Sequence, residues 1–216
     1  MKCVESLQAT IKSTRHAGEL AAKAIHAYSG QCSGKEDDPA VLLAAGKLAM
    51  TTPDRLAEAC QLLGAALARD PELHEARAFL ALAELQSGSA EAGLETAVGL
   101  AFRAPDFTFK TRLGLPTSAQ TVLGDALFQN NRIDEAIAAY ERAIRVQAHD
   151  QHAVRRLASL YLAKGQASNA SGLLNRIEVT DETRTLVSAV RLAANDASRL
   201  PSISGIASTI YCVPVV

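Results

Sequence analysis

Two histidines in the second half of the chain have a spacing at which side chains could share a metal ion. His149 and His152 are three residues apart, with Asp150 between them. Imidazole and carboxylate groups are zinc ligands, but a zinc site needs three or four of them together. No further ligand pair with suitable spacing accompanies these histidines, so we expect them to be solvated and predict no metal site.

Arg155 and Arg156 could bind a partner rather than a metal. A guanidinium group matches the geometry of a carboxylate, so this pair could grip an acidic segment or a chain's C-terminus. The alternative is that both arginines pair with acidic residues of the same chain. The sequence leaves both interpretations open.

Patterns typical of catalysis are absent from the sequence. Gly46-Lys47 is followed by Leu48 and has no matching upstream glycine, which excludes a phosphate-binding P-loop. The sequence contains no GxSxG, HExxH or HxE…CxxC pattern. We therefore expect a protein that is not an enzyme and uses no cofactor.

The cysteines and the chain ends favour an intracellular protein. The cysteines are far apart and form no CxxC pair, so we expect reduced thiols, with Cys60 packed as a small apolar residue. Met1–Thr14 has no apolar run typical of a secretory signal. The apolar stretch Gly205–Val216 is too short to cross a bilayer as a helix. The four cysteines are Cys3, Cys32, Cys60 and Cys212.

The composition of the 216 residues favours helices. Alanine accounts for 41 residues, tryptophan is absent, and aromatic residues make up 4%. Alanine favours helices, whereas sheets favour β-branched and aromatic residues, so an all-β fold is unexpected. The net charge of −1 argues against a broadly basic surface for nucleic acid or membranes. We predict neither partner.

A period of 34 residues organises the chain. Pro71 and Pro105 are 34 residues apart, and each follows an amphipathic run that a proline would end. Counted from these prolines, small residues recur in register, and helix breakers recur midway between them. This pattern predicts helix pairs that pack closely at the small residues. The predicted packing residues are Ala59, Ala66, Gly93, Gly124, Ala136, Tyr140, Ala143, Ala158 and Ala170.

The period predicts five copies and three further segments. The copy at 117–150 fits best, and its Asn130-Asn131 supplies a turn because asparagine tolerates a left-handed backbone. We expect a helix at 183–197 to cap the array, and an irregular tail at 198–216. Residues 106–116 are a predicted inserted loop whose Phe107 and Phe109 either tuck onto the array or contact a partner. The predicted copies are 1–30, 40–73, 74–105, 117–150 and 151–178.

The pattern resembles the tetratricopeptide repeat (TPR) family over about residues 1–178. The resemblance implies an all-α, right-handed superhelical solenoid of about five helix-turn-helix repeats, with the array at 1–197 closed by its capping helix. In TPR arrays the first helix of each repeat lines the concave face. By this resemblance, the residues expected to meet a partner there are Asp125, Gln129, His152, Arg155, Arg156 and Ser159.

The order of motifs is also similar to the C-terminal TPR stretch of the subunit 7 family of the anaphase-promoting complex. The motifs are Cys3–Leu7, the ALARDP ending at Pro71, Glu91–Gly93 and Leu123–Asp125. This resemblance implies a non-catalytic scaffold of a cell-cycle ubiquitin ligase, in the nucleus and cytoplasm, with other TPR and scaffold subunits as partners. A homodimer is left open. The inserted loop and the tail depart from that family.

A second hypothesis fits the same residues. An independent TPR adaptor or co-chaperone would hold a peptide in its concave groove near Arg155 and Arg156. The scaffold hypothesis predicts residence in a large assembly, whereas the adaptor hypothesis predicts a smaller particle whose peptide binding depends on these arginines.

Overall fold

The computed structural model describes residues 37–111 and 114–195. The predicted first repeat at 1–30 and the predicted tail at 198–216 lie outside the described residues. So do Cys3, Cys32 and Cys212.

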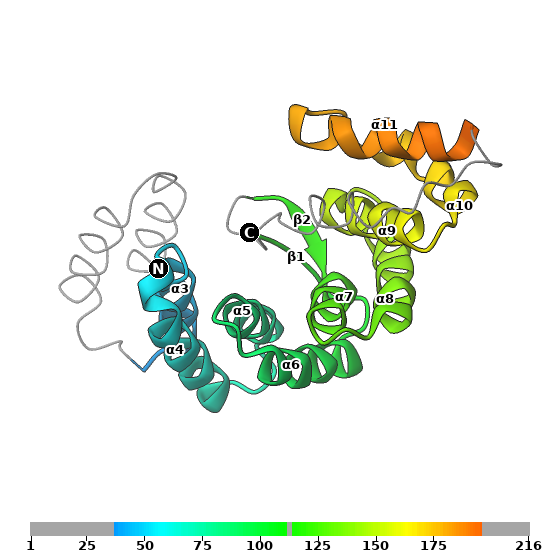
Figure 1. Cartoon of the computed structure of the whole chain (residues 1–216). Helices are drawn as coiled ribbons and strands as arrows, with labels where there is room; N and C mark the ends of the chain where they lie inside the picture. Colours follow the sequence, from blue (N-terminus) through cyan, green and yellow to red (C-terminus); the bar gives the residue numbers. More distant parts are fainter. Residues whose placement is uncertain (1–36, 112–113, 196–216) are drawn as a thin grey trace.

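Helices follow one another in antiparallel pairs along an arc, which confirms the predicted all-α helical solenoid (Figure 1). Helices α5, α7 and α9 lie on the inner side of the arc, and α6 and α8 lie on its outer side. The helices are α3 (Pro39–Ala49), α4 (Leu56–Arg69), α5 (His74–Gln86), α6 (Ala90–Arg103), α7 (Ala119–Gln129), α8 (Ile133–Val146), α9 (Gln151–Ala163), α10 (Ala167–Gly172) and α11 (Asp181–Asn195), with short 3-10 turns at Pro53–Arg55 and Leu174–Arg176.

The turns inside three of the helix pairs have the same backbone conformation. Gly88, Asn131 and Gly165 have positive φ angles of 83°, 58° and 71°. The next residue in each case donates its N–H five residues back along the preceding helix, as Arg132 does to the carbonyl of Leu127 at 2.9 Å. This bond satisfies a carbonyl at the helix end and reverses the chain. The predicted turn at Asn130-Asn131 is therefore explained by the left-handed backbone at Asn131.

Close packing within and between the pairs relies on small residues. The alanines predicted at packing positions are fully buried, and so is Tyr140. A Cβ placed on Gly124 would lie 2.6 Å from the Tyr140 ring, and one on Gly93 would lie 2.7 Å from Leu85. Each glycine therefore allows a helix-to-helix approach that alanine would prevent.

The predicted loop at 106–116 contains a short antiparallel hairpin instead of irregular chain. Strand β1 (Thr108–Lys110) pairs with β2 (Pro116–Ser118), and Phe109 lies opposite Thr117. Figure 1 shows the hairpin on the inner side of the arc. Alternating polar and aromatic residues over 107–110 suit a strand with one buried face, which accounts for the difference.

The last predicted repeat is less regular than the others. Helix α10 ends at Gly172 and gives way to a 3-10 turn, because serine, asparagine and glycine in this stretch are weak helix formers. Helix α11 follows at Asp181–Asn195 and buries Leu186, Val187 and Val190.

Candidate protein-binding surface

Two helix starts on the inner side of the arc are fixed by capping side chains. Ser118 caps α7 by accepting from the N–H of Thr121, and Asp150 caps α9 by accepting from the N–H of Ala153 at 3.0 Å. The carboxylate of Asp150 is buried and also accepts from the hydroxyls of Thr121, at 2.6 Å, and Thr117, at 3.0 Å. One carboxylate thus joins the hairpin, α7 and α9.

Asp125 joins three helices from within the array. Its side chain is 4% exposed, and its Oδ1 accepts from the hydroxyl of Tyr140 on α8 at 2.5 Å. Nε2 of His152 on α9 lies 2.8 and 2.9 Å from the two carboxylate oxygens. Nε of Arg156 lies 3.9 Å from Oδ1, and its guanidinium group stacks over the Phe128 ring at 5.4 Å.

The electrostatics of this cluster favour an ionised carboxylate. Burial by itself would raise the pKa of Asp125, but its electrostatic interactions with His152 and Arg156 and its hydrogen bonds with His152 and Tyr140 lower it. Burial, followed by the charge of Asp125, raises the pKa of Tyr140 well above its usual value. Tyr140 therefore remains a hydrogen-bond donor, and the cluster is held together by charge-assisted hydrogen bonds.

Asp125 and Ser159 were expected to line an open groove, and the structure places both in the interior. Ser159 is 7% exposed and donates its hydroxyl to the carbonyl of Arg155 at 2.9 Å. Arg156 is also largely covered, because it extends toward Asp125 and Phe128 instead of into the hollow. The interpretation of Arg156 as pairing with an acidic residue of the same chain fits this geometry.

Three predicted partner-binding residues remain accessible at this end of the array. Gln129 is exposed at the end of α7, and His152 and Arg155 are partly exposed on α9. The buried cluster beneath His152 limits the positions that its ring can adopt. The accessible surface is thus polar, carries positive charge from Arg155, and is held on a rigid base.

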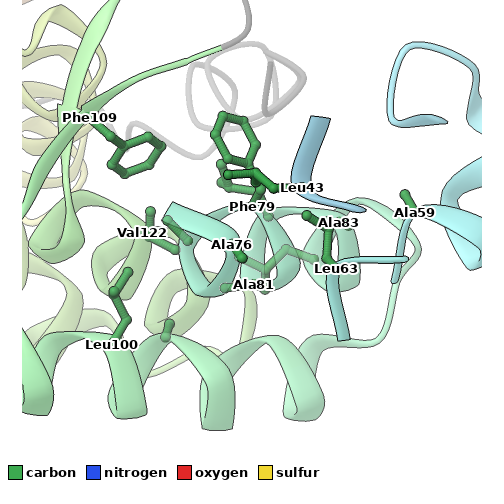
Figure 2. Packing of buried hydrophobic residues seen from close by; sticks show 14 of the residues in the cluster. Leu43, Ala59, Leu63, Ala76, Phe79, Ala81, Ala83, Leu100, Phe109 and Val122 are labelled. Atoms are coloured by element: carbon green, nitrogen blue, oxygen red, sulfur yellow. The ribbon is translucent and has the colours of Figure 1, made fainter. Parts of the chain in front are cut away.

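The two loop aromatics lie against α5. Phe109 is 9% exposed and meets the Phe79 ring edge-on at 5.5 Å, as Figure 2 shows beside Val122. Phe107 is partly exposed, stacks on Phe109 at 5.7 Å and meets the His74 ring at 5.7 Å. The tucked arrangement is therefore the observed one, and little of Phe109 is left exposed.

Several residues that shape this region were not found from the sequence. Asp150 directly precedes a helix, so its capping role has a recognisable signal. Thr117 and Thr121 meet Asp150 only through the stacking of helices far apart in the chain, for which the sequence carries no local signal. Lys47 on α3 also meets its partners through helix stacking. Its Nζ lies 4.4 Å from the centre of the Phe79 ring and 2.7 Å from Oε1 of Glu75, both on α5.

Metal-binding and membrane-spanning features were sought in the same residues. Within 37–111 and 114–195, no group of three or more His, Cys, Asp or Glu residues could hold a metal ion. His149 is exposed, whereas His152, which was also expected to be solvated, lies against the buried Asp125. None of the helices in these ranges is long and apolar enough to cross a membrane.

Comparisons with known proteins agree with the helix pairing. The family model described as "Tetratricopeptide repeat" matches residues 121–183. The structure of MamA from Desulfovibrio magneticus RS-1, residues 41 to the end, is similar with a TM-score of 0.60 at 14% identity, covering 89% of this chain and 97% of that one. A MamA RS-1 double mutant has a TM-score of 0.59 at 16% identity, covering 83% and 89%.

A third solved structure is TTC0263, described as a thermophilic TPR protein of Thermus thermophilus. Its TM-score is 0.54 at 22% identity, and the match covers 76% of this chain and 84% of that one. No curated protein matches the sequence. At these identities the similarity shows the fold, which is a TPR-type solenoid.

Proposed function

We propose that the chain is a non-catalytic protein-interaction module that binds a partner polypeptide on the inner side of its arc, over α7 and α9. The observation that carries the proposal is the TPR-type stack of helix pairs, whose inner helices present side chains on a preorganised base. A rigid surface favours binding because little conformational entropy is lost when the partner docks.

The charge of the accessible surface supports an acidic or C-terminal segment as the partner. Arg155 and His152 are partly exposed on α9, whereas the carboxylates of Asp125 and Asp150 are buried. The guanidinium group of Arg155 matches the geometry of a partner carboxylate.

Selection of peptides tests this function. The full chain is used to select from a random peptide display library, and the enriched peptides are measured by fluorescence anisotropy. We expect Arg155→Glu to weaken binding by about tenfold or more, since charge reversal adds repulsion. Arg145→Glu, at an exposed arginine on α8, is the matched control and is expected to bind normally.

Two results would overturn the proposal. One is a selection that enriches no peptide above a library without the protein. The other is equal weakening by the substitutions at Arg155 and Arg145, which would show that binding does not depend on the inner side of the arc.

A role as a subunit of the anaphase-promoting complex stays a prediction from the order of sequence motifs. The structures described above are MamA proteins and a bacterial TPR protein, and they lend it no support. Affinity capture of the tagged chain from its own cells distinguishes the two roles. Recovery of cullin and RING subunits would favour the ubiquitin-ligase scaffold, whereas a complex of the chain with one small partner would favour the adaptor.

A further inference from the structure

The hairpin on the inner side of the arc has one closed edge and one open edge. Thr111 donates its N–H to the carbonyl of Leu115 at 2.8 Å, and Ala119 donates to Phe107 at 2.9 Å. Hydrogen-bonded pairs alternate with non-hydrogen-bonded pairs in an antiparallel ladder, so Phe109 and Thr117 form the hydrogen-bonded pair between them. The backbone N–H and C=O groups of Thr108 and Lys110 therefore point away from β2.

The edge formed by β2 cannot accept another strand. Pro116 has no N–H to donate, and Ser118 already caps α7. Strand β2 also packs against α7 and α8. Growth of the sheet is thus limited to the side of β1.

The β1 edge is accessible in the part of the chain that the structure describes. Thr108 and Lys110 have exposed side chains, and no described residue outside the hairpin pairs with the backbone of β1. Unpaired edge groups of this kind act as a template for a further strand.

We propose that β1 is a docking edge to which an extended segment of a partner protein adds as a third strand. This inference rests on the proposed function, because it assigns to the protein-interaction module a specific mode of binding. Strand addition supplies affinity through main-chain hydrogen bonds and specificity through alternate side chains.

The alternation of β1 defines the side chains that the partner needs. Phe109 faces the array, whereas Thr108 and Lys110 face solvent. Residues paired across neighbouring strands share a face, so the partner residue opposite Phe109 turns toward the array, beside the partly exposed Phe107, and is apolar. The residue opposite Lys110 shares the solvent face with its ammonium group and is acidic.

The hairpin is well anchored for this role. Phe109 packs on Phe79 of α5, and Thr117 donates its hydroxyl to the buried Asp150 at 3.0 Å. Neither contact uses the outward backbone groups of Thr108 and Lys110, so a docking strand can pair with the edge while both contacts persist. The edge is therefore ordered before the partner arrives, which lowers the entropic cost of binding.

A labelled, acetylated peptide of sequence Thr-Val-Glu-Val-Thr is the probe, measured against the full chain by fluorescence anisotropy. Thr108→Pro removes an outward N–H while leaving the pairing of Phe109 with Thr117, and proline is tolerated at such an edge position. We expect it to weaken peptide binding by about tenfold or more. Thr108→Ala keeps the N–H and is expected to bind within about twofold of the unchanged chain.

Circular dichroism and thermal melting establish that both variants are folded. A second arm exchanges charge: Lys110→Glu is expected to weaken binding of the glutamate peptide and to improve binding of the same peptide with lysine in place of glutamate.

Residue-resolved amide exchange by NMR gives an independent signature. Bound peptide is expected to slow exchange at Thr108 and Lys110 but not at Phe109, whose N–H already pairs within the hairpin. The proposal is overturned if the peptide does not bind, if Thr108→Pro binds as the unchanged chain does, or if exchange at Thr108 and Lys110 is unaltered. If Thr108→Pro binds the probe peptide as the unchanged chain does while the display-selected peptides still require Arg155, the docking edge is rejected and the proposed function stands.

Discussion

Tyr140 donates its hydroxyl to the carboxylate of Asp125 at 2.5 Å, and this bond joins α8 to α7 in the interior of the array. The same carboxylate lies within 2.9 Å of His152 on α9, which belongs to the next helix pair. Asp125 therefore stabilises both the packing within one pair and the stacking of one pair on the next.

Replacing Asp125 by alanine is expected to destabilise the protein by about 3 kcal/mol, because Arg156 and Tyr140 would lose their buried partner. Tyr140→Phe removes a single hydrogen bond and is expected to cost about 1–2 kcal/mol. Urea unfolding measures both. The control is Asp134→Ala, at an exposed position on α8. If it destabilises the protein as much as Asp125→Ala does, the stabilising role of Asp125 is contradicted.

The stability of the array is expected to fall in acid through Asp125. The pKa of this carboxyl is lowered in the folded protein, so protons bind more tightly to the unfolded chain. The stability that it contributes is present above the unfolded pKa of about 4 and is lost as pH falls toward the lowered folded value. Urea unfolding across this pH range measures the free energy of unfolding, and Asp125→Asn is expected to make it depend less on pH. If the pH dependence is unchanged in the variant, other groups govern it.

Glycine-to-alanine substitutions at two helical positions are expected to have opposite effects. Gly124→Ala places a methyl group against the Tyr140 ring and is expected to destabilise by about 1–3 kcal/mol. Gly64→Ala meets no atom within 4 Å and is expected to stabilise by about 0.5–1 kcal/mol, because alanine loses less backbone entropy. Thermal melting of the two variants provides the comparison, and similar shifts of Tm would contradict the close-packing explanation.

Phe109 is expected to fix the hairpin to α5. Phe109→Ala removes its ring from Phe79 and is expected to cost about 3 kcal/mol, at the low end for a buried aromatic residue because the hairpin can move to fill the space. Urea unfolding measures the loss of stability, and NMR chemical shifts of Phe79 and of β1 report whether the hairpin still packs on α5. Phe102→Ala, at a side chain that is 86% exposed, is the control. Equal losses of stability from Phe109→Ala and Phe102→Ala would contradict the anchoring role.

Much of the helix pairing could be predicted from the sequence because it depends on local and periodic signals. The prolines that end helices, the asparagine that turns the chain and the small residues at packing positions all act within about one repeat. Alternating residues around Phe109 also carried a strand signal, although the sequence alone predicted only a loop there.

The surface was harder to predict because exposure depends on residues that are distant in the chain. The 34-residue period placed Asp125 on the inner face of its helix. Tyr140 and His152, from two other helices, contact its carboxylate and bury it. The direction of the Arg156 side chain was likewise decided by Asp125 and Phe128 together. Periodicity identifies the face of a helix, whereas the partners across that face follow from the three-dimensional stacking.

The most direct test of the central claim is an NMR titration of the isotope-labelled full chain with a display-selected peptide. The account predicts that the largest backbone shift changes fall on the inner side of the arc, at Gln129, His152 and Arg155, with little change on α6 and α8. Changes confined to the outer helices, or none at saturating peptide, would contradict the claim that this surface binds a partner polypeptide.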